Sequence, residues 1–181
     1  MDVLRLASLD LSKEFRLTRT APAIEAGLRA AIGMSVPIFL GLAAGQPAVG
    51  TVAALGCWFT LLADMGGTYG QKGSAMLAGN LASATAILVG RSVGHIPGLA
   101  SFVTFAWVFV GGLAPLFGST AAQVGLLSSI MLVIAIGVTG PVSAWSQSGW
   151  YLVGGVWATA LSLGVWSIHP NRPAREAVSK L

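Results

Sequence analysis

Long apolar runs alternate along the chain with short segments rich in glycine, proline and polar residues. No charged residue lies between Ala30 and Ala63, and Asp, Glu, Lys and Arg are all absent from Ser92 to Asn171. A helix needs about 20 apolar residues, each rising about 1.5 Å, to cross a bilayer, so each run is long enough for more than one crossing. The pattern therefore predicts an all-α protein whose helices span a membrane.

Breaks within these runs divide the chain into six predicted spans. The breaks are Gly45-Gln46-Pro47 and residues 94–98, 115–119 and 139–147, and a polar, glycine-rich segment at residues 64–73 is predicted to be a loop. Pro37 is expected to kink the first span, because it leaves the carbonyl of Gly33 without its helical donor. The predicted spans lie near residues 24–44, 47–63, 74–91, 98–114, 120–138 and 148–168.

Composition supports lipid as the solvent of this fold. Hydrophobic residues make up 55% of the chain and charged residues only 9%, against roughly 25% charged residues in a soluble domain. The net charge of +4 does not indicate nucleic acid, because most basic residues lie outside the apolar runs. The expected environment is therefore the lipid bilayer, and no nucleic-acid partner is expected.

The basic residues also predict an orientation. If the N-terminus is cytoplasmic, eight basic residues lie on the cytoplasmic side and only Arg91 on the outer side, which follows the positive-inside rule. The predicted topology is N-in and C-in, as a multi-pass protein of a bacterial inner (plasma) membrane. Residues 1–22 would be a cytoplasmic amphipathic segment or a frayed terminus, residues 23–168 the six-helix transmembrane domain, and residues 169–181 a cytoplasmic juxtamembrane tail. The eight are Arg5, Lys13, Arg16, Arg19, Lys72, Arg172, Arg175 and Lys180.

Three segments of the chain resemble the membrane domain of the fusaric acid resistance protein (FUSC) family. They are the aspartate and double glycine in residues 61–69, the small-residue entry in residues 117–125, and the Trp-Pro and Arg-Pro-x-Arg-Glu-Ala run in residues 166–177. This family belongs to the aromatic acid exporter superfamily, which also includes the plant aluminium-activated malate channels. The chain departs from the family pattern near Tyr69, where Lys72 is the only basic residue.

The resemblance implies a secondary transporter that exports organic, mainly aromatic, carboxylic acids and is driven by an ion gradient. It also implies that the tail begins a cytoplasmic domain, and that a single membrane half assembles as a homodimer or a higher oligomer. A passive anion channel and a membrane anchor or assembly scaffold remain as alternatives. No nucleophile–base pair, metal cluster or cofactor motif is visible, and Cys57 is the only cysteine, so neither an enzyme nor a cofactor is expected.

Arg29 is the most informative candidate for substrate binding, because it lies within the first predicted span. An arginine there snorkels to the interface or faces a polar cavity. Glu25 precedes it by four residues and could form a helical ion pair with it. In the functional interpretation, Arg29 binds the substrate carboxylate. Glu25 holds the guanidinium while the site is empty, and then releases it to the substrate or takes up a proton.

Four further residues are weaker candidates. Asp64 could take part in proton coupling or could order a turn before the double glycine. Asn80, Trp58 and Trp157 could line a substrate path, although an interhelical hydrogen bond is the commoner role of such an asparagine. Small residues recur on the third and sixth spans and predict close helix packing there. They are Ala75, Gly79, Ala82, Ala86 and Gly90, and then Gly154, Ala158 and Ser162.

Overall fold

A computed structural model describes residues 21–63, 69–138, 140 and 142–168 of the protein. Within these ranges, side chains are described for residues 26 to 164, except for that of Tyr69. Every regular element in these ranges is helical, which confirms the predicted all-α class. The elements are α2 (Ala21–Ala43), α3 (Pro47–Leu62), α4 (Tyr69–Val93), α5 (Pro97–Leu113), the 3-10 helix η1 (Ala114–Phe117), α6 (Ser119–Gly137) and α7 (Ala144–Ile168).

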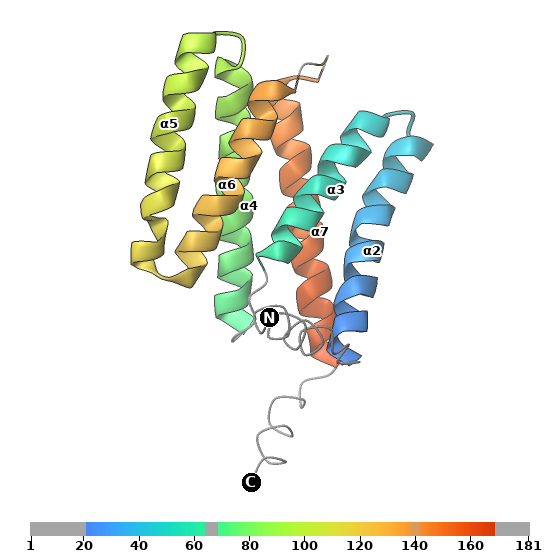
Figure 1. The fold of residues 1–181 in the computed structure, drawn as a ribbon. Coiled ribbons are helices and arrows are strands. Elements are labelled where there is room, and N and C mark those ends of the chain that lie inside the picture. The colour runs from blue at the N-terminus through green and yellow to red at the C-terminus, as the bar shows by residue number, and fades with distance from the viewer. Residues whose placement is uncertain (1–20, 64–68, 139, 141, 169–181) are drawn as a thin grey trace, which may run out of the picture.

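Successive helices run in opposite directions, as an up-and-down bundle does (Figure 1). The turns from α2 to α3, α4 to α5 and α6 to α7 lie at one end, which we call the turn end. The first residues of α2 and the last of α7 lie at the opposite end, which we call the terminal end. Helices α3, α4, α6 and α7 pack against one another in the middle, while α2 packs on α3 and α5 packs on α6.

The helix boundaries follow the predicted breaks closely, apart from the starts of α4 and α7; α7 begins at Ala144, four residues before the predicted start and within the predicted break. Gly45 and Gly118 adopt positive φ angles of 68° and 109°, as residues in tight connections between helices often do. Helix α4 begins at Tyr69 rather than at residue 74. Gly73 faces the Leu163 side chain of α7, so contact with α7 accompanies helix formation in a segment whose glycines favour a loop.

Small residues let the central helices approach closely. A Cβ atom on Gly154 would overlap the backbone of Ala53 in α3, and one on Gly90 would lie 2.9 Å from the Cβ of Ala135 in α6. Ala158 is fully buried. The predicted small-residue faces of the third and sixth spans therefore pack within the chain.

The outside of the bundle is apolar. On α5, Phe102, Phe105 and Phe109 are between 58% and 70% exposed, and Phe105 stacks on Phe109. Within the described part of the chain, four helical segments are long and apolar enough to cross a membrane: Ala26–Ala43, Gly70–Val93, Pro97–Phe117 and Ser119–Gly137. Helix α3 is apolar but shorter, at 16 residues.

Candidate functional site

Arg29 points toward α7 at the terminal end of the bundle. Its Nη1 donates a hydrogen bond of 3.1 Å to Oγ of Ser162, and Ser162 is fully buried. One turn further along α2, Gly33 packs on the side chains of Cys57 and Leu161. The guanidinium therefore lies at the point where α2 meets α7, rather than only snorkelling along the surface.

Lys72 is a second cation in this region, and its position differs from the prediction. The sequence places it in a loop, whereas it lies in the first turn of α4 and is only 4% exposed. Its neighbour Gly73 contacts Leu163, the residue after the Ser162 that Arg29 binds. Arg29 and the first turn of α4, which carries Lys72, therefore approach the same turn of α7.

Asn80 lies near the middle of α4 and is 2% exposed. Its Nδ2 donates a hydrogen bond of 3.2 Å to the carbonyl oxygen of Leu152 in α7, so the predicted interhelical hydrogen bond is present. Its Oδ1 has no hydrogen-bond partner among the described residues. Gly155 makes room for the amide, because a Cβ atom at that position would overlap it.

Three hydroxyl side chains gather near this amide. Ser83 follows Asn80 by three residues and so lies on the same face of α4, and the Tyr151 hydroxyl of α7 lies beside Ser83. Thr60 on α3 lies three residues before Ala63, and Ala63 packs beside Gly79, the residue before Asn80. Each of the three is at most 2% exposed. We call Thr60, Asn80, Ser83 and Tyr151 the central polar cluster.

The sequence analysis found only Asn80 of this cluster. The three hydroxyl residues are common in apolar helices, and nothing in their own segments marks them. The i, i+3 spacing of Asn80 and Ser83 beside a small-residue stripe was the available signal.

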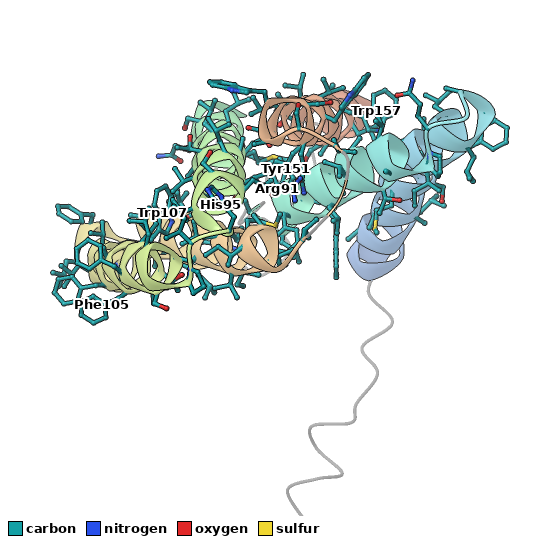
Figure 2. The ribbon with its side chains drawn as sticks, turned by 90° about the horizontal axis from the view of Figure 1, so that it is seen from above. Arg91, His95, Phe105, Trp107, Tyr151 and Trp157 are labelled. Carbon is teal, nitrogen blue, oxygen red and sulfur yellow. The ribbon has the colours of Figure 1, made fainter. Side chains whose placement is uncertain are left out.

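A cavity of about 290 Å³ runs from the turn end to Tyr151, which is the member of the cluster among its lining residues. Ala48, Val138 and Gln147 lie at its outer part, near the ends of α3, α6 and α7, and Tyr151 lies deeper along α7. Viewed from the turn end, Tyr151 lies among the central helices (Figure 2). Between the turn end and Tyr151, the walls of the cavity are apolar and include Val52, Leu55, Ile87, Met131 and Ala135.

Arg91 ends α4 at the turn end and holds the connection between α6 and α7. Its guanidinium donates to the carbonyl oxygens of Val138, Gly140 and Val142, the last two at 3.1 and 2.6 Å. These bonds account for most of its donors. The geometry indicates a structural role for this cation.

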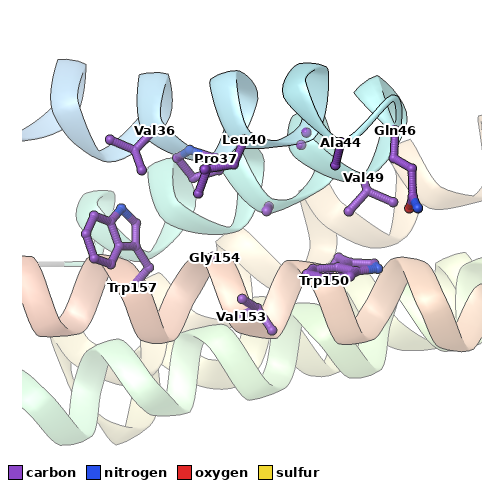
Figure 3. A pocket seen from close by; sticks show the side chains of 13 residues that line it. Val36, Pro37, Leu40, Ala44, Gln46, Val49, Trp150, Val153, Gly154 and Trp157 are labelled. Atoms are coloured by element: carbon purple, nitrogen blue, oxygen red, sulfur yellow. The ribbon is translucent and has the colours of Figure 1, made fainter.

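The two candidate tryptophans lie away from the central polar cluster. Trp58 is 43% exposed, meets the ring of Phe59 edge to face, and lines neither the cavity beside Tyr151 nor the groove that Trp157 lines. Trp157 lines an apolar groove of about 530 Å³ between α2, α3 and α7, with Trp150 further along the same helix (Figure 3). The groove and the cluster are on different sides of the α3–α7 contact at Gly154.

The two acidic candidates cannot be placed in this arrangement. Asp64 and the side chain of Glu25 lie outside the described residues. Among the residues that are described, no three His, Cys, Asp or Glu side chains gather where a metal ion could bind. The described site therefore consists of two cations at the terminal end, neutral polar groups in the middle, and a cavity that opens toward the turn end.

Comparisons with known proteins give one informative match. No model of a known protein family matches the chain, and no solved structure matches it. The chain is 31% identical over 165 residues to the uncharacterized protein slr1298 of Synechocystis sp.. The alignment covers 90% of this chain but 22% of that relative, so the chain spans about a fifth of its relative's length. Membership of the fusaric acid resistance family therefore stays a prediction, and the chain is similar to a segment of a larger protein.

Proposed function

We propose that the protein is a secondary transporter that moves organic carboxylates across a bacterial inner membrane. In this proposal all six helices cross the bilayer and both ends of the chain are cytoplasmic. The turn end then faces outward, and the terminal end with Arg29 and Lys72 faces the cytoplasm. The aromatic character of the substrate rests on the resemblance to the fusaric acid resistance family alone.

The observation that carries the proposal is the pair of cations directed into an apolar bundle. Arg29 hydrogen bonds to a fully buried serine, and Lys72 is only 4% exposed. A charge in such a place is costly unless it is solvated by polar groups or compensated by an anion. Positive charge at the mouth of a pathway also lowers the cost of removing a carboxylate from water, and the guanidinium can bind its two oxygens at once.

The burial of the polar side chains in the middle of the bundle favours a carrier over an open channel. A channel needs a continuous wet path, whereas Asn80 and Tyr151 are 2% and 1% exposed. The cavity from the turn end therefore reaches a closed region. A carrier that opens alternately to the two sides is expected to have such a closed region in the middle.

The test is flux into liposomes that contain the purified protein. A panel of labelled aromatic carboxylates is offered at neutral pH, with an imposed proton gradient, and protein-free liposomes give the passive baseline. We expect Arg29→Gln to abolish the protein-dependent flux, and Arg29→Lys to retain part of it with weaker apparent affinity, because lysine keeps the charge but not the planar fork. Thr85→Val serves as the matched control, since Thr85 is exposed and its hydroxyl bonds only within its own helix.

Other outcomes would count against the proposal in distinct ways. Normal flux through well-inserted Arg29→Gln protein would remove Arg29 from the site. Voltage-dependent current without gradient-driven accumulation would favour the passive anion channel. The absence of both flux and current would favour the membrane anchor or scaffold.

A further inference from the structure

The central polar cluster has hydrogen-bonding capacity that the described residues do not use. Oδ1 of Asn80 and Oγ1 of Thr60 are buried without a partner among them. The Tyr151 hydroxyl lies beside Ser83 but without the geometry of a hydrogen bond. Buried polar atoms are almost always satisfied by protein, water or a ligand. Three such atoms on the neighbouring helices α3, α4 and α7 therefore point to a polar group that binds between them.

The four side chains of the cluster are neutral, and the cations that the structure describes lie toward the two ends of the bundle, with Arg29 at Ser162 of α7. The segments of α3, α6 and α7 contain no charged residue. On α4 the cations Lys72 and Arg91 lie eight residues from Asn80 and Ser83, respectively, or about 12 Å along the helix axis. An ionised carboxylate bound at the cluster would lose its hydration without gaining a counter-charge.

A protonated carboxyl group matches the cluster much better. Its carbonyl oxygen accepts from hydroxyls, which Thr60, Ser83 and Tyr151 supply, and its O–H donates to an acceptor, which Oδ1 of Asn80 supplies. The apolar cavity that reaches Tyr151 offers about 290 Å³ to the rest of the molecule. One site thus provides both donors and an acceptor for the head group, and an apolar space for the body.

We propose that the central polar cluster binds the protonated carboxyl group of an organic acid whose apolar body occupies the cavity beside Tyr151. This inference rests on the proposed function and deepens it, because the acid would pass the middle of the bundle as the neutral species and take its proton with it. Arg29 and Lys72 then act on the ionised form at the terminal end. The bundle has two binding sites for two protonation states of one ligand.

Two small probes separate the sites. Benzamide is neutral and carries the same pattern of acceptor and donor as a protonated carboxyl group, while benzenesulfonate stays ionised at every relevant pH. Binding is measured by equilibrium dialysis of the labelled probe against the protein in lipid nanodiscs, with empty nanodiscs as the background. We expect benzamide to bind the central polar cluster and benzenesulfonate to bind at Arg29.

The variants should then show opposite effects. Tyr151→Phe and Thr60→Val nearly keep the shape of each side chain and remove only a hydroxyl, so each should weaken benzamide binding about five- to tenfold, as the loss of one buried hydrogen bond does. Neither should change benzenesulfonate binding, which Arg29→Gln should abolish. Thr85→Val should change neither affinity.

Each possible outcome decides between the two proposals. Benzamide affinity that is unchanged in both hydroxyl variants, or benzenesulfonate that displaces benzamide, would overturn the central site. If the wild-type protein shows no acid flux but binds benzamide in this pattern, the site stands and the transport proposal fails. If acid flux is present and benzamide does not bind, transport stands and the central site fails.

Discussion

At the scale of single residues, the two cations of α4 illustrate how position decides the role of a charge. Lys72 lies in the first turn and is buried beside α7, whereas Arg91 lies in the last turn and binds backbone carbonyls. The sequence shows both as isolated charges at the ends of one apolar segment. Their different surroundings arise from where α4 begins and from the path of the α6–α7 connection, and neither is encoded locally.

The role of Arg91 gives a prediction about stability. Arg91→Gln shortens the side chain and leaves at most two donors for the carbonyls of Val138, Gly140 and Val142. We expect the free energy of unfolding to fall by about 1–3 kcal/mol, discounted because the site is partly exposed. Thermal unfolding in nanodiscs should show this loss, while benzenesulfonate binding at the terminal end stays unchanged. If the folded Arg91→Gln protein also bound benzenesulfonate more weakly, Arg91 would belong to the anion site as well.

Of the candidate site, the sequence could reveal the charges but not the hydroxyls. Arg29 is conspicuous because it interrupts an apolar span, and Asn80 because asparagine is rare there. Thr60, Ser83 and Tyr151 gain meaning only from the convergence of α3, α4 and α7. That convergence is a property of tertiary packing, which single-helix patterns do not contain. Trp58 and Trp157 lie well inside their predicted spans, but position along a span does not specify which face of the helix a residue occupies.

At the scale of elements, breaks in the sequence predicted the helices well, since glycine and proline act locally. Gly45 and Gly118 take left-handed or otherwise extended positive-φ conformations in the connections where breaks were predicted. The start of α4 was missed, because Tyr69-Gly-Gln-Lys-Gly73 is polar and glycine-rich yet packs against α7. Tertiary contact outweighs intrinsic propensity there.

The contact between α3 and α7 gives a prediction at this scale. A methyl group at position 154 would overlap the backbone of Ala53, so Gly154→Ala must push the two helices apart. We expect a loss of about 1–3 kcal/mol in the free energy of unfolding, as for other overpacked cores. Gly164→Ala is the matched control on the same helix, because nothing lies within 4 Å of the position its Cβ would take.

The control should behave in the opposite direction. Alanine is a better helix former than glycine by about 1 kcal/mol, so Gly164→Ala should leave stability unchanged or raise it slightly. Thermal unfolding of both variants in the same nanodiscs makes the comparison. Equal stability of the Gly154→Ala and Gly164→Ala proteins would mean that α3 and α7 do not meet as closely as the structure has them.

At the scale of the whole molecule, the apolar exterior is the property that the sequence predicts most directly. An apolar residue that faces lipid and one that faces a helix look alike in composition, so the sequence does not say which faces remain outside. The structure buries Gly154 and Ala158 within the chain, so a homodimer must use other faces. Oligomeric state stays a prediction.

The membrane topology is tested by cysteine labelling in a Cys57→Ser background. Ser92→Cys and Ser143→Cys, both exposed near the turn end, should react with an impermeant thiol reagent added to intact cells. Ser12→Cys and Ser179→Cys should react only after the membrane is opened, because eight basic residues favour the cytoplasm for that side.

Val133→Cys on α6 adds a direct control for lipid, since Val133 is 54% exposed yet lies within an apolar segment long enough to cross a bilayer. The aqueous reagent should label the cysteine at position 133 neither in intact cells nor in opened cells. In the proposed topology the exposed face of α6 meets acyl chains, which exclude the reagent. Labelling at position 133 in opened cells would contradict membrane crossing by α6, and labelling at position 12 in intact cells would reverse the orientation.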